Sequence, residues 1–240
     1  MKLYRVLQSQ GFGSRKGCLA RVRAGAVAVN GVVCDDPEAE VDPAGLELTL
    51  DGATWPYREK AYVLMHKPAG YECSHHPSHY PSVFSLLPPP LLQRGVQCVG
   101  RLDQDTTGLL LFSDDGQFIH RMISPKKGVA KVYRATCAEP VGDAMLEALR
   151  VGVQLNDEPA PIAALACERL DKTTLRLTLA EGKYHQVKRM IAAAGNRVDS
   201  LHREAMGCYA LPATLAPGAW RWLEPADLHQ LEQPWPSAMS

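Results

Sequence analysis

The chain has 240 residues, of which 46% are hydrophobic, and its 26 basic residues balance its 26 acidic ones. It has no apolar run of the roughly 18 residues that a membrane span requires. The segment Met1–Arg5 lacks the features of a secretory signal, so we expect a cytoplasmic, globular and monomeric protein without a membrane partner. The seven cysteines are odd in number and form no CxxC pair, which argues against a disulfide framework and a conventional zinc site.

The charges are segregated along the chain although they sum to zero. Residues 1–31 carry six cations and no acid, whereas residues 35–51 carry seven acids and no base. Two further basic clusters lie at 121–134 and 183–203. Basic clusters of this kind favour a nucleic-acid partner, and the alternative is a set of solvated faces that only keep the protein soluble.

The first predicted elements form a small N-terminal module. Ser14 is a suitable N-cap for a helix over 15–23, and Gly25 is a suitable end for it. A strand over 26–29 then enters an Asn30-Gly31 hairpin turn, and another strand follows at 46–50. The chain divides near the segment 55–60, so we expect a domain over residues 1–56.

This pattern resembles the S4 RNA-binding domain. The shared features are a Ser-Arg pair that opens a basic helix, a glycine, alternating valines and an Asn-Gly turn. The resemblance implies that this module contacts RNA through polar and basic residues at the helix, which are Ser14, Arg15, Lys16, Arg21 and Arg23.

The rest of the chain predicts many short strands and few helices. We expect strands at 61–66, 96–100, 108–113, 131–138, 162–167 and 173–180, and helices at 116–123, 142–150, 184–195 and 225–231. The prolines at 77–81 and 88–90 predict loops. Strands and helices do not alternate regularly, so we expect an α+β domain with a mostly antiparallel, mixed sheet over 60–232 and a tail at 233–240.

The most informative segment is the polar turn from Gly100 to Gly108, which separates two apolar runs. It places Asp103 and Asp105 between segments that can be buried as strands, where a loop can aim a reactive acid. Arg101 can pair with one carboxylate. The alternative is an Asx-type turn in which both aspartates accept hydrogen bonds from backbone N–H groups, and spacing does not choose between the two.

Two further segments can complete a site. In 181–190 a predicted helix puts Lys188 and Arg189 at its polar margin, where one of them can reach a buried carboxylate, unless this is only a basic surface helix. Lys131-Val132-Tyr133 places a tyrosine beside cations, as a core residue or as a stacking surface for a base.

The histidines give no comparable signal. Cys73, His75, His76 and His79 have no tetrahedral metal-ligand spacing, so we expect no metal site. His185 and His202 are available acids or bases, but their spacing singles out neither.

Together these motifs resemble the RNA pseudouridine synthases, and specifically the branch with an S4 domain that modifies ribosomal RNA. The segments that carry the resemblance are GRLDQDTTGLLL, Lys131-Val132-Tyr133, EGKYHQVKRM and Leu201-His202-Arg203. The stretches YVLMHKPAGYECS, SPKKGVAKVYRAT and LHREAMG are most similar to the subgroup that acts on uridine 516 of 16S ribosomal RNA.

The resemblance implies a role for each matching residue. Asp103 is the catalytic carboxylate, Tyr133 stacks on the target base and Leu201 packs against both. Lys188 stands at the position of the basic partner of Asp103, with Arg189 and Arg101 as further support, and Asp105 shapes the turn. The other expected RNA contacts are basic residues, namely Lys126, Lys127, Lys131, Lys183 and Arg203.

The implied reaction suits these residues. Pseudouridine formation breaks the N1–C1′ bond of a flipped-out uridine and joins C5 to C1′, so we expect one carboxylate and no metal or cofactor. Other readings are a synthase for a large-subunit uridine and a non-catalytic RNA-binding or ribosome-assembly factor. An Asp-dependent phosphatase is a further alternative, but it requires a strand that ends directly at the first aspartate, whereas residues 100–102 intervene here.

Overall fold

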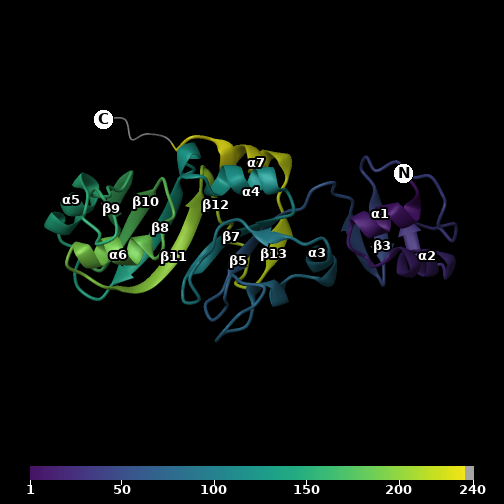
Figure 1. Cartoon of the computed structure of the whole chain (residues 1–240), viewed down its shortest axis with the longest axis horizontal. Helices are drawn as coiled ribbons and strands as arrows, with labels where there is room; N and C mark the ends of the chain where they lie inside the picture. Colours follow the sequence, from purple (N-terminus) through teal and green to yellow (C-terminus); the bar gives the residue numbers. More distant parts are fainter. Residues whose placement is uncertain (236–240) are drawn as a thin grey trace. The chain divides into compact units, whose positions relative to one another are not determined.

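The structure is a computed structural model that describes residues 1–235, and the chain forms two compact units (Figure 1). The first unit contains Met1–Ala61 and Leu87–Gln97. The second contains Tyr62–Leu86 and the chain from Cys98 onward. Of the tail predicted at 233–240, residues 236–240 lie outside the described part. No helix among the described residues is long and apolar enough to cross a membrane.

The helix, the hairpin turn and the strands predicted for the N-terminal module are present in the first unit, whereas α1 and β4 were not predicted. Helix α2 spans Arg15–Arg23, and the Ser14 side chain accepts a hydrogen bond from the Gly17 N–H at 3.2 Å. Gly25 ends the helix with a φ of 65°, and the Asn30-Gly31 turn joins β1 and β2 with both residues at positive φ. The remaining elements of this unit are α1 (Leu3–Ser9), α3 (Pro89–Gln93) and a sheet in the order β2 (Val32–Val33), β1 (Val27–Val29), β3 (Glu47–Leu50), β4 (Ala53–Pro56).

Helix α3 corrects the prediction of a loop at 88–90. Pro89 occupies the first position of the helix, where proline is tolerated because its missing N–H would have no partner. Arg94, which follows α3, donates hydrogen bonds to the Gln10 side chain and to the Arg58 and Glu59 carbonyls at 2.8–3.0 Å. These contacts explain why 87–97 groups with the N-terminal unit, an association that sequence order does not show.

The second unit is built on a mixed sheet in which β7 and β11 pair in parallel and the other strands are antiparallel to their neighbours along its main path. The α+β prediction is therefore confirmed. The strand order is β13 (Trp220–Trp222), β5 (Tyr62–Lys67), β7 (Thr107–Ser113), β11 (Val198–Met206), β8 (Lys131–Cys137), β10 (Thr174–Leu179), β9 (Ala166–Arg169), and β12 (Tyr209–Ala210) pairs with β11. Short strand β6 spans Gln97–Cys98.

Helices cover this sheet and complete its core. Helices α4 (Gly116–Ile123) and α7 (Pro225–Glu232) lie side by side in Figure 1. Phe118 and Met122 of α4 pack in one buried cluster with Leu111 of β7 and Leu231 of α7. The other helices are α5 (Asp143–Val151), α6 (Gln186–Ala193) and the short 3-10 turns η1 (Val83–Leu86) and η2 (Pro125–Lys127).

Several predicted elements differ from the observed ones. The strand expected at 96–100 is reduced to β6, and the one expected at 162–167 begins only at Ala166, while Ile162 forms an isolated bridge with Val153. The helix expected at 184–195 begins at Gln186, because His185 has a left-handed backbone with a φ of 48°. Strand β11 was not predicted, because its apolar residues alternate irregularly with charged ones and two shifts in register interrupt its pairing with β8.

Candidate active site

The polar turn at 100–108 is fixed at its end by the close approach of two strands. Gly108 has a φ of 109°, and a Cβ atom built on it would lie 2.3 Å from the Arg203 carbonyl oxygen. Only glycine therefore fits here, and β7 passes directly beside β11. The Thr107 hydroxyl also contacts His202 Nδ1 at 2.8 Å, so the exit of the turn is held by both backbone and side chain.

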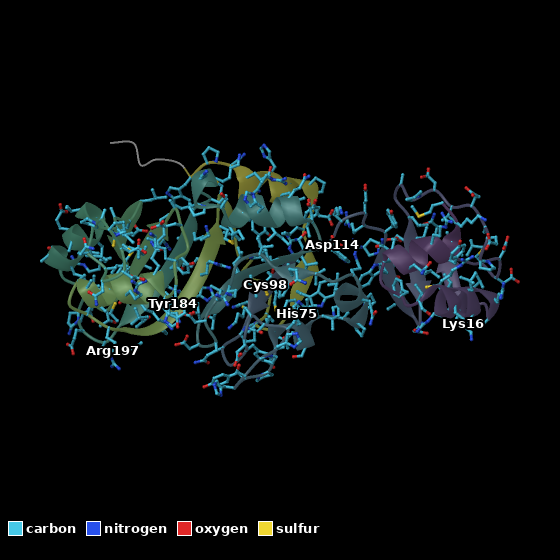
Figure 2. The ribbon with its side chains drawn as sticks, in the orientation of Figure 1. Lys16, His75, Cys98, Asp114, Tyr184 and Arg197 are labelled. Carbon is cyan, nitrogen blue, oxygen red and sulfur yellow. The ribbon has the colours of Figure 1, made fainter. Side chains whose placement is uncertain are left out.

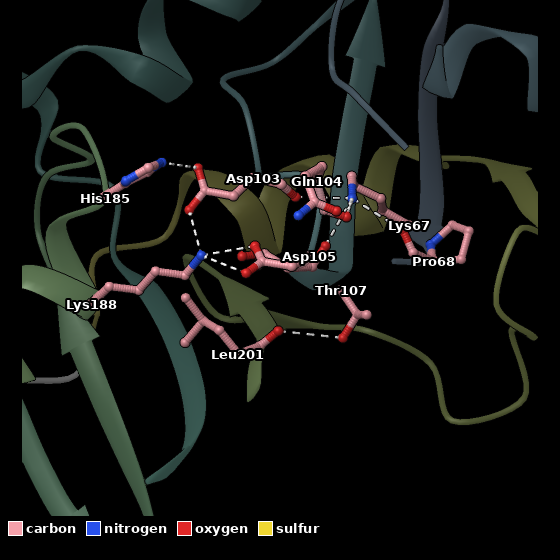
Figure 3. A network of polar contacts seen from close by, with 10 residues as sticks. Lys67, Pro68, Asp103, Gln104, Asp105, Thr107, His185, Lys188 and Leu201 are labelled. Carbon is pink, nitrogen blue, oxygen red and sulfur yellow. Dashed lines mark hydrogen bonds and ion pairs between the residues drawn. The ribbon is translucent and has the colours of Figure 1, made fainter. Parts of the chain in front are cut away.

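A buried lysine at the end of β5 donates hydrogen bonds to the backbone of the turn. Lys67 is fully buried, and its Nζ donates hydrogen bonds to the carbonyls of Pro68, Asp103, Gln104 and Thr106 at 2.9–3.2 Å (Figure 3). Burial lowers the pKa of Lys67. The sequence analysis did not single out this residue, although a Lys-Pro pair that directly ends an apolar strand is an available signal.

The Asp103 carboxylate lies between two nitrogen-bearing side chains from the segment that opens α6. His185 Nε2 is 3.2 Å from one carboxylate oxygen, and Lys188 Nζ is 3.2 Å from the other (Figure 3). The Asp103 side chain is about 30% exposed, so it is accessible from solvent. Both oxygens of this acid are thereby oriented, and one oxygen faces a side chain that can exchange a proton.

Lys188 also serves the second aspartate of the turn. Its Nζ lies 2.8 and 2.9 Å from the two carboxylate oxygens of Asp105. Burial lowers the pKa of Lys188, but its hydrogen bonds and charge interactions with Asp105 and Asp103 outweigh this effect and raise it. The same contact lowers the pKa of Asp105 against the opposing effect of burial. One cation thus balances two carboxylates.

The structure distinguishes the two cations that the sequence left open. Lys188 contacts Asp103, whereas Arg189 pairs with Asp157 and donates a hydrogen bond to the Tyr184 carbonyl at 3.2 Å. Arg101 is exposed and makes no ion pair with Asp103, although both residues line a small cavity. The expected contact between Arg101 and a carboxylate of the turn is therefore absent among the described residues.

A small cavity of about 60 Å³ opens beside Asp103. Its walls include Tyr133, Leu201 and Lys188, together with His185. Tyr133 and Leu201 are both buried, at 8% and 7% exposure, and they come from the neighbouring strands β8 and β11. The cavity thus places Asp103 and its two polar partners beside two apolar side chains, a combination typical of small-molecule sites.

His185 joins this site through an unusual backbone conformation. Its left-handed φ of 48° immediately precedes α6, and its ring stacks on that of Tyr184 with centroids 3.8 Å apart. Tyr184 itself is 73% exposed and is labelled in Figure 2. The sequence spacing did not identify His185, and its position directly before the basic helix is the signal that was available.

The residues predicted to contact RNA occupy different environments. Ser14, Arg15, Lys16, Arg21 and Arg23 are exposed on or beside α2, where Lys16 is labelled in Figure 2, and Lys126 and Lys127 are exposed in η2. Arg21 pairs with Asp51 at 3.0 Å. Lys183 pairs with Glu158 and Glu181 at the edge of the cavity.

Lys131 and Arg203 are interior residues and do not belong to an exposed basic surface. Lys131 is 6% exposed and donates a hydrogen bond to the Val129 carbonyl, and Arg203 is 2% exposed and donates one to the Leu109 carbonyl at 2.8 Å. Burial and the nearby charge of Arg203 lower the pKa of Lys131 to about 8. Both lie on inward-facing positions of central strands, which charge counts along a sequence do not distinguish.

The segment around Cys73 contacts the turn without forming a metal site. Cys73 Sγ accepts a hydrogen bond from the Leu102 N–H at 3.5 Å. A hydrogen bond with Cys98 lowers the pKa of the Cys73 thiol. Among residues 1–235 there is no group of three or more histidine, cysteine or acidic side chains arranged to hold a metal ion.

These features define a protein of two units, of which the first carries the basic helix α2 and the second an enzyme-like cavity lined by Asp103. A solved structure described as a pseudouridylate synthase matches it with a TM-score of 0.68 and 34% identity, over 96% of this chain and 99% of that one. Family models match at residues 61–193, described as RNA pseudouridylate synthase, and at residues 1–47, described as the S4 domain.

Curated relatives are similar over nearly the whole chain. An uncharacterized RNA pseudouridine synthase of Bacillus subtilis (strain 168) is 39% identical over 98% of this chain and 99% of its own length. Ribosomal small subunit pseudouridine synthase A of Escherichia coli (strain K12) is 37% identical over 95% of this chain and 98% of its own. The chain belongs to the RNA pseudouridine synthase family and carries an S4 domain, so its activity is the isomerisation of uridine in RNA.

Proposed function

We propose that this enzyme converts a uridine of small-subunit ribosomal RNA to pseudouridine, with Asp103 as its catalytic carboxylate. The observation that carries the proposal is the position of Asp103 in the cavity, between His185 and Lys188 and beside Tyr133. The substrate class is supported by the names of relatives that are similar over both units.

Asp103 is favoured over Asp105 by exposure and by partners. The Asp105 side chain is 54% exposed, and Lys188 contacts both of its oxygens. Asp103 is less exposed and lines the cavity, which Asp105 does not. In this proposal Asp105 stabilises the charged form of Lys188, while Asp103 acts at the sugar.

The cavity walls suit a base that has left its stack. Unstacking a base costs a few kcal/mol, and stacking on an aromatic ring restores about 1–3 kcal/mol. Tyr133 provides such a ring and Leu201 an apolar surface beside it. The proposed reaction then breaks N1–C1′, turns the uracil and joins C5 to C1′, with Asp103 acting either on C1′ or on the 2′ proton.

The remaining proposals concern the RNA as a whole. We assign uridine 516 of the small-subunit RNA as the target, by similarity to the synthases that carry this specificity. The exposed cations of α2 supply phosphate contacts, since clustered basic residues dominate the affinity of proteins for RNA. Lys126 and Lys127 add further basic surface on the second unit.

The test compares two RNA substrates. Purified protein is incubated with small-subunit and large-subunit ribosomal transcripts in the presence of EDTA, and pseudouridine is mapped along each. We expect one modified uridine, at position 516 of the small-subunit RNA, and no modification of the large-subunit transcript. Modification of the large-subunit transcript alone would contradict the proposed substrate, and a strict requirement for Mg²⁺ would contradict the proposed chemistry.

A further inference from the structure

The isomerisation contains a proton transfer in addition to the step at the sugar that is assigned to Asp103. Once C5 of the uracil has bonded to C1′, C5 still carries its own hydrogen. Pseudouridine forms only when this C5 hydrogen leaves as a proton. The C5–H electrons then form the C5=C6 bond, the N1=C6 electrons move to N1, and N1 takes up a proton. Atoms and electrons balance without any oxidant or co-reactant, but a base is required.

The position of this proton follows from the chemistry at Asp103. C5 is bonded to C1′ at this stage, so its hydrogen lies within about two bonds of the sugar carbon beside which Asp103 works. A base must come within about 3 Å of the group that it deprotonates. The base therefore has to be an immediate neighbour of the Asp103 carboxylate.

Two side chains contact that carboxylate, and only one of them is suited to accept a proton. Lys188 has a raised pKa because Asp105 and Asp103 stabilise its charged form, so it stays protonated and has no free electron pair. His185 contacts the other oxygen at 3.2 Å. An imidazole both accepts and donates protons near neutral pH.

We propose that His185 is the base that removes the C5 proton after the uracil has reattached. In the tautomer with its proton on Nδ1, the ring keeps a free electron pair on Nε2, the nitrogen beside Asp103. The imidazolium that forms when Nε2 takes the C5 proton then pairs with the Asp103 carboxylate. Nδ1 has no hydrogen-bond partner among the described residues. The stacked ring of Tyr184 and the left-handed backbone of His185 hold the imidazole in this orientation.

Tyr133 is the competing candidate because it also lines the cavity. A phenol becomes a base only after it has lost its own proton, which for tyrosine ordinarily occurs near pH 10. Tyr133 is a buried residue of β8, whereas the His185 side chain is 37% exposed and can pass its proton to solvent. In this assignment Tyr133 stacks on the base and His185 handles the proton.

The experiment measures whether breaking of the C5–H bond limits the rate of pseudouridine formation. It rests on the proposed function and uses full-length protein in single-turnover reactions with RNA carrying uridine or 5-deuteriouridine at the target. For His185→Gln we expect pseudouridine formation to slow by about 10²- to 10⁴-fold and to depend on deuterium at C5. His120→Gln, which changes an exposed histidine of α4, serves as the matched control and behaves as the wild type.

A rescue experiment guards against a merely structural loss. In His185→Ala, free imidazole is expected to restore part of the rate, because it supplies the missing base. An unchanged deuterium effect in His185→Gln, or the appearance of that effect in Tyr133→Phe instead, would overturn the assignment to His185. A wild-type protein that formed no pseudouridine in any RNA would instead contradict the proposed function itself.

Discussion

Helix α2 and the turn at 100–108 both concentrate polar residues. They differ in whether their charged side chains are paired with other residues of the protein. On α2 the side chains of Lys16 and Arg23 are exposed, and neither has a hydrogen bond or ion pair with any described residue. In the turn, both carboxylates are paired with Lys188, and the backbone carbonyls are bound by Lys67.

The difference matches two physical tasks. Attraction of a polyanion requires charges that are free to meet phosphates, whereas a reaction requires a charge fixed in place before the substrate arrives. The comparison therefore predicts that substitutions in the turn change stability or rate, while substitutions on α2 change affinity and its dependence on salt.

The largest effect on stability is expected for Lys67→Met. The substitution removes the buried donor that four carbonyls share. The Asp103 and Gln104 carbonyls keep the backbone N–H groups of Thr106 and Gly70, whereas those of Pro68 and Thr106 lose the lysine without such a replacement, and we expect the free energy of unfolding to fall by about 3 kcal/mol or more. Denaturant unfolding measures this change. Lys172→Met, at an exposed position, is the control, and equal stability of the two variants would break the contrast between fixed and free charge.

Lys188→Met tests the shared cation. Without it Asp103 and Asp105 repel each other and Asp103 loses its orientation, so we expect a fall of about 10²-fold in the single-turnover rate. Lys188→Arg keeps the charge and is expected to recover part of this loss. A Met variant with the full wild-type rate would show that the ion pairs of the turn do not serve the reaction.

A double substitution on α2, Lys16→Gln with Arg23→Gln, sharpens the other side of the comparison. We expect affinity for RNA to fall by about tenfold. The slope of log K against log salt concentration is expected to become shallower by roughly 0.7–0.9 for each phosphate that the protein no longer neutralises. The single-turnover rate at saturating RNA stays unchanged. Filter binding over a salt series measures the affinity and its salt dependence. A slower single-turnover rate at unchanged affinity would contradict the proposal that the α2 cations serve RNA binding.

A pH-dependent effect is expected for Lys131, which belongs to neither kind of region because its charge is buried. Its pKa falls from an ordinary 10.5 to about 8, so between these values the unfolded chain binds more protons than the folded one. Stability relative to Lys131→Met therefore rises with pH across this window, by at most about 3 kcal/mol. Thermal unfolding of both proteins between pH 7 and 10.5 checks the direction.

Local signals explain how much of the fold was predictable. The Ser14 cap, the Gly25 helix end and the Asn30-Gly31 turn depend on neighbouring residues, and each was predicted from the sequence. Strand β11 depends on distant partners, since its polar residues are accommodated by pairing with β7 and β8. Association of 87–97 with the N-terminal unit is likewise a long-range property.

The same division applies to the site. The polar turn with its two aspartates and the basic segment that opens α6 were visible as patterns, and Lys188 was one of two cations named as candidate partners of Asp103. The roles of Lys67 and His185 were not predicted. Lys67 reaches carbonyls 36 to 39 residues away, and His185 depends on a left-handed backbone that residue spacing does not reveal.

The most direct test of the account measures rate and affinity together in Asp103→Asn. This change removes the charge of one carboxylate with almost no change in size, and Asp105→Asn is its matched control. We predict that Asp103→Asn loses at least about 10⁴-fold in pseudouridine formation while it binds RNA as the wild type does, and that Asp105→Asn remains active. Full activity of Asp103→Asn would contradict the account.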